Sequence, residues 1–94
     1  MRPDPITDYV ITEHAAVELG RRGLTEEMIG QILANPEQQQ DVRPGRIVLQ
    51  SRVTMDVPAK EYLMRVFVDV DRKPAEVVTA YRTSKISKYW RDQP

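Results

Sequence analysis

The pattern of hydrophobic and polar positions predicts two helices in the first third of the chain. Thr12 can cap a first helix, which runs to about residue 22 and ends at Gly23, a residue suited to the left-handed conformation after a helix. Thr25 can cap a second helix, which ends before Pro36. The core-facing stripe of this second helix consists of Met28, Ile29, Ile32 and Leu33. Because very few residues join the two helices, we expect them to form an αα-hairpin.

After the helices, the pattern changes to the β-branched and alternating runs that are typical of strands. The predicted strands cover residues 38–43, 47–54, 62–70 and 76–82. Two helices followed by four strands indicate an α+β fold, in which a four-stranded antiparallel sheet carries the αα-hairpin on one face. The prolines in residues 1–11 predict an irregular arm, and residues 1–94 have the length of a single domain.

The last two strands can pair in two registers, which exchange the faces of the sheet. One register sets Asp69 across from Glu76, a like-charge pair, so the prediction favours the other. The favoured register places four residues on the core face: Val66, Val68, Val78 and Ala80. The opposite, uncovered face then carries Arg65, Phe67, Asp69, Thr79 and Tyr81. A ligand could bind to this half-polar face.

Residues 84–94 mix cations with aromatic side chains, and we expect them to form a short helical or extended tail. Its apolar residues recur at helical spacing: Ile86, Tyr89 and Trp90. Its cations fall on the other side: Lys85, Lys88 and Arg91. Such a tail could bind a polyanion, because cations neutralise phosphates and aromatic rings stack on unpaired bases. Alternatively, it is a solvated basic tail that Trp90 anchors to the core.

Composition removes several classes of chemistry. No cysteine occurs, which excludes disulfides, thiolate nucleophiles and the usual zinc sites, and a single histidine excludes a His-based metal cluster. We therefore expect no cofactor, although scattered carboxylates could hold Mg²⁺. No signal-peptide pattern and no run of membrane-spanning length occurs, which predicts a soluble, cytoplasmic protein without membrane contact.

Charge is balanced over the whole chain but not along it. Residues 1–45 hold eight acidic residues against four arginines, whereas residues 46–94 hold ten cations against six anions. A basic face opposite an acidic one is therefore compatible with a net charge of zero.

The residue types for metal-free cleavage of RNA are all present. Attack by a 2′-hydroxyl group needs a base, an acid for the leaving oxygen, and cations around the phosphorane. His14, in the first turn of the first helix, can act as the base, and Tyr81 can donate a proton or position the substrate. The candidate cations are Arg65, Arg82 and Lys85. The alternative for His14 is an exposed residue without a role in chemistry.

Three further side chains have both a structural and a functional interpretation. Arg22, near the end of the first helix, can bond the last carbonyl groups or belong to a site. Gln50 and Arg52 share one face of a predicted strand, where they either line the ligand face or remain solvated.

Short motifs along the chain add a family resemblance. In order, they are His14-Ala15, Leu19, Arg22-Gly23-Leu24-Thr25, Pro36-Glu37-Gln38, Arg43-Pro44-Gly45-Arg46, Gln50-Ser51-Arg52 and Val78-Thr79-Ala80-Tyr81-Arg82-Thr83-Ser84-Lys85. With these motifs, residues 12–90 resemble a family of small phage- and plasmid-associated domains of unassigned function. That family is grouped with the barnase-EndoU-colicin-RelE superfamily of ribonuclease toxins.

The resemblance implies a RelE-like fold and the role of a toxin in a toxin-antitoxin pair, or of a related RNA-cleaving effector. The family's helix-start histidine falls on His14, its Arg-Gly on Arg22-Gly23, and its Thr-x-Tyr on Thr79 and Tyr81. Many members carry Arg four residues after the histidine, where this chain has Glu18. That carboxylate either orients the imidazole through an i, i+4 contact or marks the loss of an RNA-binding cation.

Together, residues and resemblance predict a metal-independent endoribonuclease toxin. The predicted catalytic residues are His14, Arg65, Tyr81 and Arg82. The predicted RNA-binding residues are Arg22, Arg52, Thr79, Lys85, Lys88 and Arg91. The expected partners are RNA and a cognate antitoxin, and a homodimer is compatible with the sequence. The alternatives are a non-catalytic RNA- or protein-binding module, or an antitoxin- or immunity-like subunit that uses Tyr89-Trp90 as an anchor.

Overall fold

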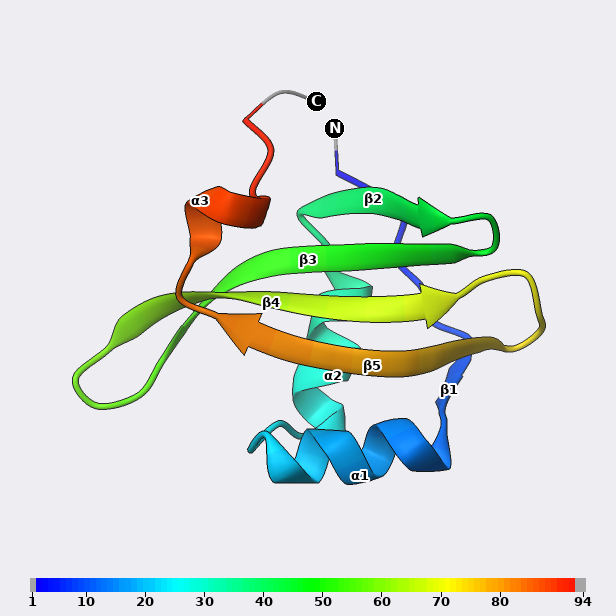
Figure 1. Ribbon diagram of the computed structural model, residues 1–94, viewed down its shortest axis with the longest axis horizontal. Coiled ribbons are helices and arrows are strands. Elements are labelled where there is room, and N and C mark those ends of the chain that lie inside the picture. The colour runs from blue at the N-terminus through cyan, green and yellow to red at the C-terminus, as the bar shows by residue number, and fades with distance from the viewer. Residues whose placement is uncertain (1, 93–94) are drawn as a thin grey trace.

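Five strands form one mixed sheet in the computed structural model, which describes residues 2–92. They are β1 (Tyr9–Ile11), β2 (Gln38–Arg43), β3 (Arg46–Met55), β4 (Lys60–Asp69) and β5 (Ala75–Thr83). Their order across the sheet is β1-β5-β4-β3-β2 (Figure 1). All neighbours are antiparallel except β1, which pairs in parallel with β5. The four predicted strands occur and pair antiparallel, but β1 makes the sheet five-stranded and mixed, so the predicted four-stranded antiparallel sheet is matched only in part.

The helices begin and end at the residues that the sequence indicates. They are α1 (Glu13–Arg21), α2 (Glu26–Ala34) and the single turn α3 (Ile86–Tyr89). Thr12 Oγ1 accepts a hydrogen bond from the Ala15 amide, and Thr25 Oγ1 accepts one from the Met28 amide, each at 3.1 Å. Gly23 has a φ of 69° and ends α1 in the left-handed conformation. None of the helices within residues 2–92 is long and apolar enough to cross a membrane.

The two longer helices contribute to one core but pack on different strands. In Figure 1, α2 crosses behind the sheet, where it packs on β3 and β4, whereas α1 runs alongside β5. The predicted αα-hairpin is therefore matched only in part: the helices follow each other closely, but each binds its own part of the sheet. The core consists of Leu19, Leu24, Ile29, Ile32, Leu33, Leu49, Met64, Val66, Val68, Val77 and Ala80.

The prediction of an irregular arm over residues 1–11 is wrong for Tyr9–Ile11. These residues have high β-propensity and lie beyond the two prolines, so nothing prevents them from pairing with β5. Tyr9 and Ile11 also pack against the core. The pairing reaches only from Ala75 to Val77 on β5, and the next stretch of that edge faces α1.

The register of β4 and β5 combines the two alternatives that the sequence offers. Val66 pairs with Ala80, as expected, but Val68 pairs with Val77, because a bulge at Val78 shifts the register between them. The bulge also sets Asp69 directly across from Glu76. The pair is tolerated because a cation compensates each carboxylate. Arg46 Nε lies 2.6 Å from Asp69 Oδ1, and Arg72 Nη1 lies 3.4 Å from Glu76 Oε1.

The C-terminal tail crosses the sheet face opposite α2, from the end of β5 to β2. The carbonyl of Tyr89 accepts hydrogen bonds from Gln40 Nε2 at 3.0 Å and Gln50 Nε2 at 3.1 Å. As expected, its apolar residues are half-buried, and its cations Lys85, Lys88 and Arg91 are exposed. Residues 93–94 of the predicted tail lie outside the described residues.

We predict that Asp69→Asn destabilises the fold by about 2 kcal/mol at pH 7, because it leaves the Arg46 guanidinium without its carboxylate. The hydrogen bond from Arg46 lowers the pKa of Asp69. The stabilisation is thus complete above the unfolded pKa of about 3.9 and is lost as the pH falls through the lower folded pKa. Urea unfolding of both proteins between pH 7 and pH 2 should show the stability difference shrinking in acid. Asp41→Asn, at an exposed position, is the control, and a difference that persists at pH 2 would contradict the charge pair as its source.

Candidate functional site

Four polar side chains meet where α1 runs alongside β5, and we call them the α1–β5 cluster: His14, Glu18, Arg22 and Thr79. His14 Nε2 lies 3.5 Å from Glu18 Oε2, and the Thr79 hydroxyl donates to Glu18 Oε1 at 2.8 Å. Arg22 Nη1 donates to Thr79 Oγ1 at 3.0 Å and to the carbonyl of Ala80 at 2.7 Å. Thr79 therefore links the carboxylate and the guanidinium through one hydroxyl group.

The local structure explains why these residues meet. Positions 14, 18 and 22 recur every four residues, so they project from one face of the helix and its C-terminal cap. The bulge at Val78 and the end of β1 leave the Ala80 carbonyl on an unpaired edge, where Arg22 reaches it. The side chain of Arg22 thus bonds β5 and not the last carbonyl groups of α1.

Glu18 is held as a carboxylate. The hydrogen bond from Thr79 lowers its pKa, and the charges of Arg22 and His14 act in the same direction. The side chain of His14 is 80% exposed, so a substrate can reach the ring that Glu18 contacts. Of the two interpretations of Glu18, the contact with the imidazole is the one that the geometry provides.

A second group lies on the sheet face that the tail covers, and we call it the tail-face cluster: Gln50, Arg65, Tyr81 and Tyr89. Arg65 Nη1 donates to the Tyr81 hydroxyl at 2.6 Å, and Arg65 Nε donates to Gln50 Oε1 at 2.9 Å. The guanidinium also lies 4.2 Å from the ring centre of Tyr89. Gln50 is fully buried, so it is neither solvated nor a free ligand contact.

The two clusters are neighbours along β5. Thr79 pairs with Phe67 and Tyr81 pairs with Arg65, so Thr79 and Tyr81 project from the same face. Two residues along a strand span about 7 Å, which brings Tyr81 next to the α1–β5 cluster. The structure therefore brings together His14, Arg22 and Thr79 of the predicted site. Tyr81 lies beyond Thr79 at the Arg22 end of the cluster, with Arg65 behind it, whereas His14 lies at the other end.

Arg82 does not belong to this group. It pairs with Met64 and lies on the opposite face from Tyr81, because adjacent residues of a strand alternate in direction. Its Nη1 atom lies 3.6 Å from Asp56 Oδ1, and its guanidinium lies 4.8 Å from the ring centre of Tyr62. Its predicted catalytic role is therefore not supported by its position.

The guanidinium of Arg52 is bound by other side chains of the protein and is therefore not free to bind RNA. Its guanidinium contacts both Glu37 carboxylate oxygens, at 3.3 and 3.0 Å, and lies 4.2 Å from the ring centre of Trp90. The hydrogen bond from Arg52 lowers the pKa of Glu37. The pair fixes the start of β2 and the indole of the tail, so only part of the Arg52 charge is available to a ligand.

Sequence reasoning missed the glutamines that hold the tail. Gln38 and Gln40 alternate along β2 and bond the backbone of the tail: Gln38 Oε1 accepts from the Arg91 amide at 3.1 Å, and Gln38 Nε2 donates to the Arg91 carbonyl. The run Gln38-Gln39-Gln40 could have indicated this role, because side chains two residues apart on a strand lie on the same face of the sheet.

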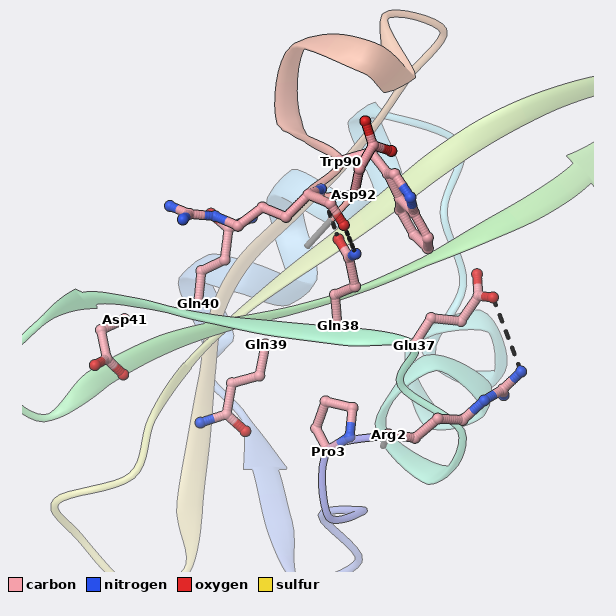
Figure 2. A pocket seen from close by; sticks show the side chains of 10 residues that line it. Arg2, Pro3, Glu37, Gln38, Gln39, Gln40, Asp41, Trp90 and Asp92 are labelled. Atoms are coloured by element: carbon pink, nitrogen blue, oxygen red, sulfur yellow. Dashed lines mark hydrogen bonds and ion pairs between the residues drawn. The ribbon is translucent and has the colours of Figure 1, made fainter. Parts of the chain in front are cut away.

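A groove of about 870 Å³ runs along the outer edge of β2 (Figure 2). Trp90 and Arg91 of the tail line one side, and Arg2, which lies 3.9 Å from Glu37, belongs to the other. The groove lies at the opposite edge of the sheet from the α1–β5 cluster and contains no histidine. This groove and the candidate chemistry are therefore separate.

Comparisons with known proteins add no assignment: no protein-family model, curated protein or solved structure matches the chain. Within residues 2–92, no group of three or more acidic or histidine side chains is placed to hold a metal ion. Any functional conclusion therefore depends on the geometry of the two clusters.

We predict that Thr79→Val raises the pKa of Glu18 towards its ordinary value, because it removes the hydrogen bond that lowers this pKa most. A titration of side-chain carboxylate signals by NMR would measure the change. Thr83→Val is the matched control, since Thr83 lies on the same strand and accepts only from the Lys85 amide, at 3.1 Å. An unchanged Glu18 titration in Thr79→Val would contradict the link between β5 and α1.

Proposed function

We propose that this protein is a metal-independent endoribonuclease with its active site at the α1–β5 cluster. The observation that carries the proposal is the exposed His14 ring beside the ionised Glu18, with Arg22, Thr79 and Tyr81 within the same surface. A carboxylate that orients an imidazole is a common arrangement for general base catalysis. Glu18 acts here as a positioning residue.

The reaction follows from the chemistry of these groups. His14 removes the proton of a 2′-hydroxyl group, and the 2′-oxygen attacks the adjacent phosphorus. Arg22 stabilises the negative charge of the phosphorane. We assign this role to Arg22 instead of Arg82, which lies on the opposite face of the sheet. Tyr81 gives its proton to the 5′-oxygen as the P–O bond breaks, which leaves a 2′,3′-cyclic phosphate.

Arg65 prepares Tyr81 for this role. Because Arg65 Nη1 donates to the phenol oxygen at 2.6 Å, the hydroxyl proton of Tyr81 is directed to another acceptor, which is Tyr89 in the free protein and the 5′-oxygen in the proposed reaction. Arg65 lies on β4 directly across from Tyr81 and away from the α1–β5 cluster, so its part in this step is to support Tyr81 rather than to contact the scissile phosphate.

The biological role that we propose is that of a toxin with a RelE-like fold, paired with an antitoxin that covers the site. The α+β architecture and the motifs around His14, Arg22 and Thr79 support this role. An antitoxin would prevent cleavage by covering the exposed His14 ring.

A second candidate is a non-catalytic RNA- or protein-binding module. One observation favours it: Arg22 already bonds Thr79 and Ala80 and lies 3.8 Å from Glu18, so its charge is partly offset before any substrate binds. A module of this kind would bind RNA without cleaving it.

We predict that His14→Ala lowers the rate of RNA cleavage by about 10²- to 10⁴-fold, the usual contribution of a general base. Cleavage by the wild-type protein should persist in EDTA, yield a 2′,3′-cyclic phosphate, and stop when the scissile position is 2′-deoxy. Induced expression should slow growth, and His14→Ala should relieve this. Lys73→Ala, at an exposed turn away from the cluster, is the control with wild-type activity.

Three outcomes would distinguish cleavage by 2′-hydroxyl attack from another cleavage mechanism and from RNA binding without cleavage. Cleavage of the deoxy-substituted RNA, or activity abolished by EDTA and restored by Mg²⁺, would contradict attack by the 2′-hydroxyl group. Intact RNA together with measurable RNA binding would favour the non-catalytic module.

A further prediction concerns the exposed cations of the tail. Replacing Lys85, Lys88 and Arg91 by Ser should weaken RNA binding and reduce the slope of log K against log salt by about 2, because three phosphate contacts are lost. The matched control replaces three other exposed cations, Arg43, Lys60 and Lys73, by Ser. Equal slopes for the two triple variants would show that the tail does not contact the RNA backbone.

A further inference from the structure

Arg65 carries a buried positive charge that no carboxylate balances among the described residues. It is 8% exposed, and none of the ion pairs within residues 2–92 includes it. Buried charges are normally paired, because burial removes their hydration. Here the neighbours are a neutral amide, a neutral phenol, and the rings of Tyr89 and Phe67, at 4.2 and 5.4 Å from the guanidinium carbon.

One nitrogen of this guanidinium remains available. Nε and Nη1 donate to Gln50 and Tyr81, whereas Nη2 makes no hydrogen bond to the described residues. No completely buried side-chain nitrogen or oxygen in residues 2–92 lacks a partner, so Nη2 is not completely buried and belongs to the exposed 8% of Arg65. An anion can therefore contact Arg65 without displacing its two protein acceptors.

The neighbouring Tyr89 lies beside two cations, Arg65 and Lys88. A hydrogen bond from Tyr81 lowers the pKa of Tyr89, and the hydrogen bond and charge of Lys88 and the charge of Arg65 act in the same direction. A lower phenol pKa means that negative charge on this oxygen is favoured. Lys88 Nζ lies 5.3 Å from the ring centre of Tyr89, so two cations flank one ring.

We infer that Arg65 and Lys88 form a phosphate subsite, which binds the RNA phosphate next to the one cleaved at the α1–β5 cluster. This inference rests on the proposed function for the identity of the ligand. The spacing supports it: Thr79 and Tyr81 lie about 7 Å apart along β5. An RNA strand that follows this edge would present one phosphate to Arg22 and the next to Arg65. The preferred substrate is then an RNA with at least two phosphodiester groups.

The anion chemistry can be tested directly with inorganic phosphate. In a ¹⁵N NMR titration of arginine side chains, the Nε–Hε signal of Arg65 should shift saturably. Lys88→Ser should weaken this binding about tenfold, because it removes one charge-assisted contact. Lys60→Ser is the matched control, since Lys60 is exposed at the start of β4 and lies 5.5 Å from the ring centre of Tyr62 rather than beside Tyr89. An unmoved Arg65 signal, or equal effects of the two lysine variants, would overturn the subsite.

The RNA ligand is tested by comparing a dinucleoside monophosphate with a trinucleoside diphosphate that has the same scissile step. The wild-type protein and Lys60→Ser should cleave the longer RNA with about tenfold higher kcat/KM, and Lys88→Ser should lose this preference. Equal cleavage of both RNAs by the wild type, despite phosphate binding at Arg65, would overturn the assignment to RNA and leave a site for free anions. If neither RNA is cleaved, the nuclease proposal fails, whereas a saturable Arg65 shift would still support the phosphate subsite.

Discussion

The extra residue at Val78 determines which way the candidate site residues of β5 point. Without this bulge, the pairing of Val68 with Val77 would continue and set Thr79 across from Val66 and Tyr81 across from Met64, inside the core. The bulge turns both polar residues to the other face and places Ala80 in the core instead. It also coincides with the end of pairing by β1, so α1 can contact the edge of β5. One irregularity in one strand therefore creates the place where helix and sheet share a polar cluster.

Among residues 2–92, several carboxylates have a nearby arginine, whereas the one buried cation, Arg65, has no carboxylate partner. Asp69 is opposed by Arg46, Glu37 by Arg52 and Glu18 by Arg22, so most pairs are short and confined to neighbouring elements. Arg65 differs, because its partners are neutral or aromatic. A protein of zero net charge can thus present a positive position on one face of its sheet.

The tail has a structural role that its basic composition conceals. Its apolar residues and backbone pack on the sheet face, where the Tyr89 ring lies against Arg65 and amides of β2 and β3 hold the backbone. The cations of the tail remain exposed. The tail is therefore anchored by its apolar residues and backbone, while its cationic side chains remain exposed.

The sequence by itself determined the α+β class, the caps of both helices, four of the five strands and the two sides of the tail, because these depend on local propensity and periodicity. It also indicated the contact between His14 and Glu18, which a helix fixes through its own spacing. Only the tertiary structure decided the rest. The pairing of Tyr9–Ile11 depends on a free strand edge, and the bulge depends on the balance between two charge pairs and core packing. The separation of Arg82 from Tyr81 could have been predicted, because adjacent residues of a strand point to opposite faces. The contact between Thr79 and Glu18 of α1 could not, because the two residues are 61 positions apart in the chain.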